Sequence, residues 1–351
     1  MPGRRSRERL NETEETQKKA RERKMKNERL GRGSIINYLI ALAAIFSLNF
    51  VLPRLMPGDP LHAIYGDEAL VAMTPEMEAY LIRQFALDKS WSEQLSAYLI
   101  GLLHGDLGFS YYYKDQVSTV ILGALPWTLL LAVLALALAT VMGAVMGIEA
   151  GSRRGRLLDS GLTASLMFLG GFPMFFMGIL LLLIFGVSLG WAPLSGAVTP
   201  YAGLEGVDYF LDFLHHLVLP ILALVLVLVG DSFLITRNTV VSILGDAFIL
   251  TARSIGCSQF AVKYTHTGRN SLLPLITETG MRIPHLLIQT LFIEIVFSYP
   301  GIGLLLNTAL YSRDYPLLQG ILLLLTVIVL TVNLAVDLLY RKLDPRVRYA
   351  H

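Results

Sequence analysis

A group of ionisable residues lies in an otherwise apolar stretch, residues 272–297. Glu278 and Arg282 are four residues apart with the acid first, so a helix would place them on one face in the favourable order for an ion pair. His285 follows on the same face, and Glu294 lies further along. A charged side chain costs about 2.5–3.5 kcal/mol to insert at the centre of a membrane helix. These groups therefore predict either the polar wall of a path through the membrane or a structural ion pair near the inner membrane surface.

Other polar residues offer no catalytic chemistry. His215 and His216 are adjacent, so a helix would point them in different directions, and an interfacial position explains them better than a metal site. Cys257 is the single cysteine, which excludes an intrachain disulfide and a cysteine-based metal cluster. Asp231 faces either a neighbouring helix or the pathway. The spans contain no nucleophile with a base and no carboxylate pair, as an intramembrane protease would need. The sequence predicts no catalytic residue, no metal ligand and no covalent reaction.

The elements that must position these residues are membrane helices. Of 351 residues, 54% are hydrophobic and only 16% are charged, unlike the composition of a soluble domain. Long runs such as "LLLAVLALALA" favour helices over the alternating strands of a β-barrel. Windows long enough to cross a bilayer occur at 33–53, 116–148, 160–204, 213–230 and 315–336, and the charged window 272–297 is a sixth candidate. The predicted fold class is all-α, a polytopic membrane protein with six transmembrane helices.

Basic residues are unevenly distributed between the predicted spans. Residues 1–33 hold 12 Lys and Arg mixed with six Glu, and they predict a cytoplasmic tail, disordered or a frayed helix, that contacts lipid headgroups rather than nucleic acid. The first apolar stretch begins only at Ser34 and lacks a cleavage site, so we expect it to remain as the first span. Six alternating spans place the basic segments 149–157, 238–271 and 341–351 on the same side as the tail. The positive-inside rule then predicts a multi-pass protein of the cell (inner) membrane with both termini cytoplasmic.

The chain beyond the tail, residues 34–351, is predicted to form one transmembrane domain with two long connections. The outer connection, 54–116, is too long for a simple linker. In it, Thr74 is a predicted N-cap and Pro75 the first helical residue. The apolar residues of this helix recur at helical spacing, which predicts that it lies on the outer membrane face, on a partner or against the core. They are Met77, Tyr80, Leu81 and Phe85.

The second long connection, 238–271, is predicted to be cytoplasmic. Its stretch "DAFILTARSIG" predicts a short helix that ends at Gly256, and Ser258 can cap a second one. The apolar residues Phe248, Ile249, Ala252 and Ile255 are expected on one side of the first helix. A connector needs only a few residues, so a projection of this size is explained most simply by a binding partner. An amphipathic loop resting on the inner membrane surface is the alternative.

"TARSIG", followed by "RNSLLP", resembles the cytoplasmic coupling loop of ABC import permeases, with Ala252 and Gly256 at the small-residue positions of that loop. Further stretches resemble the dipeptide, oligopeptide and nickel class of these permeases, in particular the subunit with the long first outer loop. They are "RLMPGDP" (54–60), "GLLHGDLGFS" (101–110), "LPWTLLLAV" (125–133), "EIVFSYPGIG" (294–303), "RDYPLLQG" (313–320) and "DLLYRKLDPRVRY" (337–349). The resemblance covers nearly the whole chain from residue 34.

The resemblance implies the type I ABC importer permease fold and transport of peptides by alternating access. The chain has no G-x-x-x-x-G-K-[ST] phosphate loop, so this chain is expected to bind no cofactor, and ATP and Mg are expected in partner ATPase subunits. The implied partners are a homologous second permease subunit, two ATP-binding cassette ATPases and an extracytoplasmic solute-binding protein. The residues expected to couple the chain to the ATPases are Asp246, Thr251, Ala252, Arg253, Gly256 and Lys263. Those expected in the translocation pathway are Glu278, Arg282, His285 and Glu294.

The chain departs from the family pattern in ways that bear on its substrate. Ser254 and Ile255 replace a small and a basic residue after "TAR", and the span 272–297 is charged where relatives tend to be rich in glycine. A nickel chelate or another small solute is therefore an alternative to peptides. An ion-coupled secondary transporter is a further alternative, but it would show interrupted spans in both halves. Here Pro284 is expected to interrupt only one span.

Overall fold

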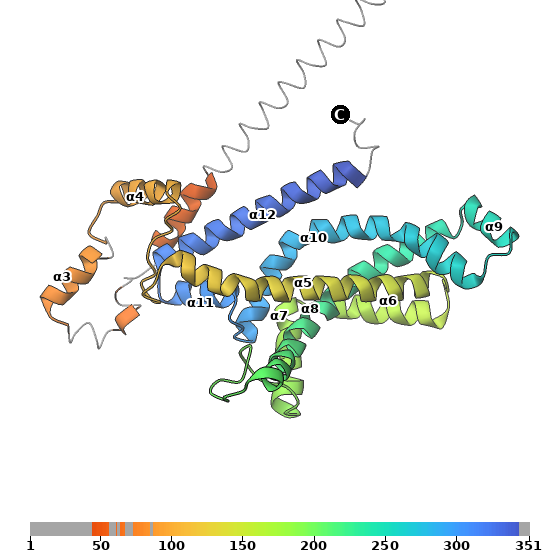
Figure 1. Cartoon of the computed structure of the whole chain (residues 1–351), viewed down its shortest axis with the longest axis horizontal. Helices are drawn as coiled ribbons and strands as arrows, with labels where there is room; N and C mark the ends of the chain where they lie inside the picture. Colours follow the sequence, from red (N-terminus) through yellow and green to blue (C-terminus); the bar gives the residue numbers. More distant parts are fainter. Residues whose placement is uncertain (1–43, 56–60, 62–63, 67–72, 85–86, 344–351) are drawn as a thin grey trace, which may run out of the picture. The chain divides into compact units, whose positions relative to one another are not determined.

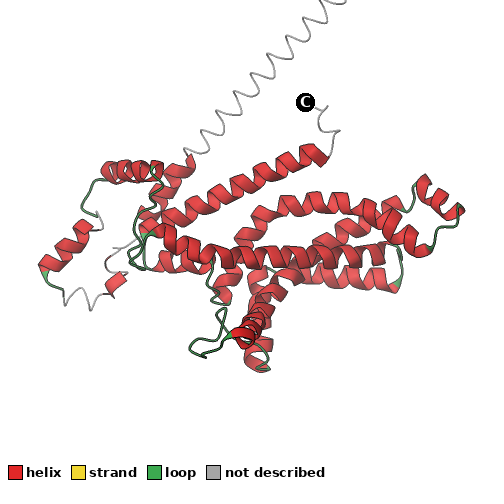
Figure 2. Ribbon diagram, viewed as in Figure 1, coloured by secondary structure: helices red, strands yellow, loops and turns green. Residues whose placement is uncertain are grey.

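In the computed structural model, residues 44–55, 61, 64–66, 73–84 and 87–343 are described, and the tail 1–33 lies outside this part. Two compact units are present, Met1–Pro57 and Gly58–His351. The first is described through one helix, Ala44–Arg54, in which Arg54 Nη1 donates to the Phe50 carbonyl (2.8 Å). The described part of the second unit contains helices and a single isolated bridge (Figure 2), which confirms the all-α class.

The helices of the second unit follow one another along the chain in Figure 1. They are α3 (Pro75–Gln84), α4 (Trp91–Leu103), α5 (Val117–Gly151), α6 (Leu157–Gly170), α7 (Met174–Leu181), the π-helical η1 (Leu182–Ser188), α8 (Gly206–Ile243), α9 (Ala247–Ser254), the π-helical η2 (Ala261–Gly268), α10 (Arg269–Val296), α11 (Ile302–Tyr311) and α12 (Tyr315–Leu343). Within the described ranges, α5, α8 and α12 are long and apolar enough to cross a membrane, and α6 with α7 and η1 forms a fourth candidate. The count of six spans stays a prediction.

The window 160–204 does not form the single straight helix that its composition suggests. It breaks after α6, and the helix that follows is bent by 97° relative to α6. The break falls in the sequence Gly170–Gly171–Phe172–Pro173. Glycine disfavours a helix because its backbone is flexible, and proline has no N–H to donate to the preceding turn. The expected interruption at Pro284 is wrong, because Pro284 lies inside the continuous helix α10. The broken span is therefore in the first half of the bundle.

The long helices α5 and α8 are in close contact through a row of small residues. Every fourth residue of α5 from 135 to 151 is alanine or glycine, and all five are buried. A Cβ added at Gly147 would lie 2.7 Å from Cβ of Thr236 and 2.8 Å from the carbonyl oxygen of Phe233, closer than real Cβ atoms approach. Gly143 and Gly151 meet α8 at similarly short distances. Residues four apart form one ridge along a helix, so this row lets the two backbones approach along four turns.

Helix α10 completes the core by packing on both α5 and α8. Trp127 of α5 makes an edge contact with Tyr299, just after α10 (5.8 Å between ring centroids), and packs on Phe213 of α8 (6.0 Å). Ile293 and Phe297 are buried in the same cluster. The charged window 272–297 is therefore held against the two long helices rather than lying alone on the surface.

The outer connection is ordered by caps and by one buried carboxylate. The Thr74 side chain accepts a hydrogen bond from Met77 N (3.3 Å), which confirms the predicted N-cap of α3. On that helix Leu81 is buried, whereas Met77 and Tyr80 are exposed; Phe85 lies outside the described residues. Asp314, between α11 and α12, accepts hydrogen bonds from the Ser110 hydroxyl (2.5 Å) and from Tyr112 N (3.0 Å).

These contacts fasten the end of the outer connection to the turn before α12. Burial raises the pKa of Asp314, and the hydrogen bonds from Ser110 and the backbone partly oppose that shift. Ser110 ends the motif "GDLGFS" and Asp314 belongs to the motif "RDYP", so their hydrogen bond joins the two motifs.

The close α5–α8 contact predicts that glycine cannot be replaced at Gly147. Gly147→Ala should lower the melting temperature of the purified protein, because the added methyl group overpacks the interface at a cost of about 1–3 kcal/mol. Gly123, on the same helix, has open space around it. The control Gly123→Ala should have no effect or raise the melting temperature, since alanine favours helix by about 1 kcal/mol. Equal effects of the two changes would contradict the close packing.

Candidate translocation and coupling sites

Arg282 lies between two carboxylates from different helices. Its Nε and Nη2 donate to Oε1 of Glu278, both at 3.1 Å, which confirms the predicted pair within α10. Its Nη1 lies 2.5 Å from Oδ2 of Asp231 on α8. Asp231 is therefore the second partner of Arg282, and this contact joins α8 to α10. The Asp231 side chain is 57% exposed, so this cluster is open to whatever occupies the adjoining space.

That space is a cavity of about 540 Å³ between α7, α8 and α10, here called the charged cavity. Arg282, Asp231 and His285 line it, together with Gln289 and the Phe172–Pro173 break. The remaining lining residues are apolar or glycine, namely Gly170, Met174, Val227, Leu228, Met281 and Leu286. A mostly apolar cavity with a few convergent polar groups is the usual form of a site for a small solute. Arg282 and His285 thus line the cavity, whereas Glu278 pairs with Arg282 without being a lining residue. The pathway role of these three residues stays a prediction.

Glu294 does not line the charged cavity. It is fully buried near the end of α10, where its Oε2 accepts from Gly303 N (2.5 Å). A Cβ at Gly301 would overlap the Glu294 carboxylate, and one at Gly303 would overlap the backbone of Leu291. The stretch "EIVFSYPGIG" is thus a tight turn wrapped around this carboxylate. The pathway role of Glu294 stays a prediction, and its contacts support a structural one.

The predicted cytoplasmic segment folds as a compact projection of α9 and η2. Ile249 and Ala252 of α9 and Val262 of η2 are buried against one another. Gly256 has φ +84° just after α9, which confirms that glycine ends this helix in a conformation other residues rarely adopt. The Ser258 hydroxyl accepts from Ala261 N (3.2 Å), as expected of a cap.

The predicted apolar face of α9 is partly wrong. Ile249 and Ala252 face η2, whereas Phe248 and Ile255 are 43% and 74% exposed. Helix α9 has only about two turns, so its neighbour buries only a narrow strip of its surface. Ile255 is the C-cap residue that follows the helix. Ala252 is therefore small because it packs inside the projection. Asp246 is the residue just before α9, and Thr251 and Arg253 are exposed on α9. Phe260, just before η2, is 71% exposed.

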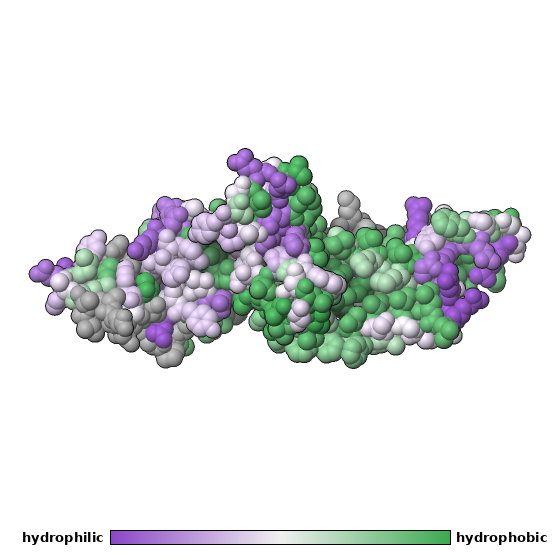
Figure 3. Space-filling view, turned by 90° about the horizontal axis from the view of Figure 1, so that it is seen from below, coloured by the Kyte–Doolittle hydropathy of each residue, from purple (hydrophilic) through white to green (hydrophobic). Residues whose placement is uncertain are grey.

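The projection is braced against α5 by Glu149. The Lys263 ammonium forms an ion pair with Glu149, and the Tyr264 hydroxyl donates to the same oxygen (2.5 Å). The hydrogen bond to Glu149 raises the pKa of Tyr264, which stays protonated and able to donate. Lys263, predicted as a coupling residue, thus contacts the membrane helices of its own chain. Figure 3 shows hydrophilic residues gathered at the end of the unit that carries α9, beside a broad apolar surface.

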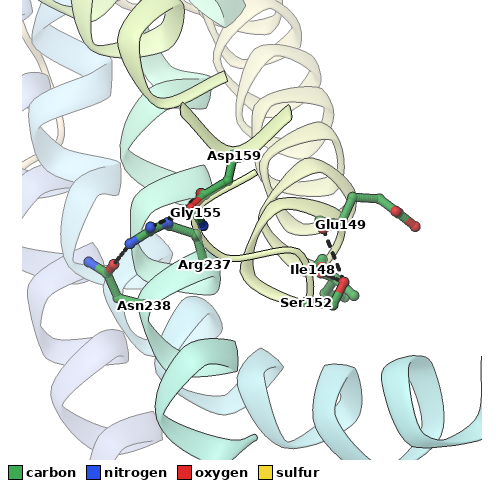
Figure 4. Close-up of polar contacts among 7 residues, drawn as sticks. All are labelled: Ile148, Glu149, Ser152, Gly155, Asp159, Arg237 and Asn238. Atoms are coloured by element: carbon green, nitrogen blue, oxygen red, sulfur yellow. Dashed lines mark hydrogen bonds and ion pairs between the residues drawn. The ribbon is translucent and has the colours of Figure 1, made fainter. Parts of the chain in front are cut away.

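A second brace was missed by sequence reasoning. Asp159, at the start of α6, is buried, and its carboxylate receives two hydrogen bonds from Arg237 of α8, each 2.8 Å (Figure 4). Gly155 N donates to the same carboxylate (2.9 Å), and Asn238 accepts from the other end of the guanidinium (3.0 Å). A bidentate pair of this geometry is strong and directional. The sequence signal for this pair was Asp159 directly before the uncharged window 160–204 and Arg237 shortly after the uncharged window 213–230.

Comparison with known proteins shows the family of the chain. Residues 139–349 match the family model described as "Binding-protein-dependent transport system inner membrane component". The chain is 34% identical to the di/tripeptide transport system permease protein DppB of Pseudomonas aeruginosa and 33% identical to the dipeptide transport system permease protein DppB of Escherichia coli. Each alignment covers 86% of this chain and 93% of the relative. The matched region contains the charged cavity and the projection, and the chain belongs to the family of binding-protein-dependent transport system inner membrane components.

Proposed function

We propose that this chain is the membrane-spanning permease subunit of an ATP-driven importer of peptides, and that solute passes the charged cavity. The observation that carries the proposal is Arg282 held between Asp231 and Glu278 at the edge of that cavity. A peptide has an ammonium group at one end and a carboxylate at the other, so neighbouring charges of both signs suit it. The names of the relatives support the same substrate class. A nickel chelate is the alternative, and family membership favours an ATP-driven importer over an ion-coupled transporter.

Energy is proposed to come from two ATPase subunits that bind the α9–η2 projection on the cytoplasmic side, where both termini also lie. The projection is rigid in the way such a role requires, because it has its own small core and is fastened to α5 through Glu149. Its exposed apolar side chains, Phe248, Ile255 and Phe260, suit a protein partner. A second permease subunit and an extracytoplasmic solute-binding protein complete the proposed importer.

The proposed pathway can be tested by removing the charge of Arg282, which lines the charged cavity, or of its partner Glu278. Arg282→Gln and Glu278→Gln should each lower the maximal rate of peptide uptake by roughly tenfold or more, the effect of losing one hydrogen bond to a charged group. The yield of assembled transporter should stay near that of the unchanged protein. Uptake of di- and tripeptides and of a nickel chelate is measured in vesicles with saturating binding protein. Asp208→Asn, an exposed acid at the start of the same helix as Asp231, is the control.

A purely structural role for the pair gives a different pattern. Each single change would then leave an uncompensated charge and reduce the yield, while the double change Glu278→Gln plus Arg282→Gln would restore both yield and uptake. That result would rule out the pathway proposal.

The proposed ATPase contact can be tested on the exposed side chains of the projection. Ile255→Asp combined with Phe260→Asp should lower the amount of ATPase recovered with the tagged chain by roughly tenfold or more, because burying each side chain contributes about 1.5–3 kcal/mol. The melting temperature of the permease itself should change little. Leu103→Asp, at a side chain 87% exposed on α4, is the matched control. Normal ATPase recovery with the double variant would refute this contact surface.

A further inference from the structure

A second cavity of about 540 Å³ lies between the ends of α5 and α8 and the α9–η2 projection, and four cations line it. Arg153 and Arg156 come from the turn after α5, Arg253 from α9 and Lys263 from η2. No aspartate or glutamate is among its lining residues. We call it the basic cavity.

The cations of the basic cavity are only partly neutralised. Glu149, beside the cavity, pairs with Lys263 and lies 3.4 Å from Arg153. In the part of the chain that the structure describes, neither Arg156 nor Arg253 has an ion-pair partner. Two guanidinium groups thus face this space without a counter-ion, an arrangement suited to an anion with several acceptor oxygens, and above all to phosphate.

The other walls of the basic cavity narrow the choice of anion. Val240 and Leu244 at the end of α8 and Val262 of η2 give it an apolar side. The cavity lies at the ends of α5 and α8, two helices that are long and apolar enough to cross a membrane. An apolar wall beside basic side chains at the end of two such helices suits a molecule with an anionic head and an acyl tail. A soluble phosphate compound would use the cations but not the apolar wall.

We propose that the basic cavity binds the phosphate of an anionic phospholipid. A lipid there contacts three elements: the end of α5, the end of α8 and the projection. The bound headgroup screens the repulsion between Arg156 and Arg253 and holds the projection against the bundle. The proposal does not depend on which solute the transporter carries.

The test uses the full chain purified with its partner subunits and transferred to nanodiscs. Binding of fluorescent phosphatidylglycerol is measured against phosphatidylcholine, and the double variant Arg156→Gln plus Arg253→Gln should bind phosphatidylglycerol about tenfold more weakly. Arg154→Gln, in the same turn but absent from the cavity wall, is the matched control and should bind normally. Arg156→Lys plus Arg253→Lys keeps the charge and should restore most of the binding. Melting temperatures of all variants confirm that they are folded.

Two further measurements distinguish a phospholipid from a soluble phosphate compound as the bound anion. Millimolar inorganic phosphate or glycerol phosphate should not displace the lipid, since neither uses the apolar wall; displacement at such concentrations would overturn the lipid proposal in favour of a soluble anion. Equal phosphatidylglycerol binding by the unchanged protein and the Gln double variant would also overturn it. Loss of ATPase recovery with lipid binding unchanged would instead identify the cavity as part of the protein interface.

Discussion

The close approach of α5 and α8 is the constraint on which the rest of the structure depends. A row of alanine and glycine on α5 lets the two backbones meet along four turns, and α10 then packs on both helices. In a membrane, where apolar side chains gain little by leaving lipid, close van der Waals contact of this kind is a main source of helix association. This contact holds α8 in place, and α8 both lines the charged cavity and leads into the α9–η2 projection.

Helix α8 joins the charged cavity to the α9–η2 projection. Asp231 contacts Arg282 in the first, Arg237 anchors the start of α6 through Asp159, and α9 begins four residues after α8 ends at Ile243. From Asp231 to Ile243 the helix rises about 18 Å without a break. We propose that a displacement of the projection reaches the charged cavity through this unbroken helix, and that the Glu149 brace makes α5 move with it. Rigid elements that link two sites in this way are the usual means of coupling.

Local features of the fold could be predicted from the sequence, whereas contacts between distant helices could not. The Glu278–Arg282 pair, the Thr74 and Ser258 caps and the positive φ of Gly256 each depend on a few neighbouring residues. The contact of Asp231 with Arg282 depends on how α8 and α10 pack, which no local pattern reveals. The break at Gly170–Pro173 had a local signal in its glycines and proline, but the apolar composition of the window concealed it. The face of α9 was misjudged because its burial depends on η2, not on its own periodicity.

In the proposed function, solute passes the charged cavity as the transporter alternates between two states. Gln289 lines the cavity and can be replaced by cysteine in a Cys257→Ser background, leaving a single thiol in this chain. The assembled transporter is treated with a membrane-impermeant thiol reagent from each side, with and without a non-hydrolysable ATP analogue. We expect the reactive side to change with the nucleotide and peptide to slow the reaction. A thiol that reacts from the same side in both states, or never reacts while uptake is normal, would contradict it.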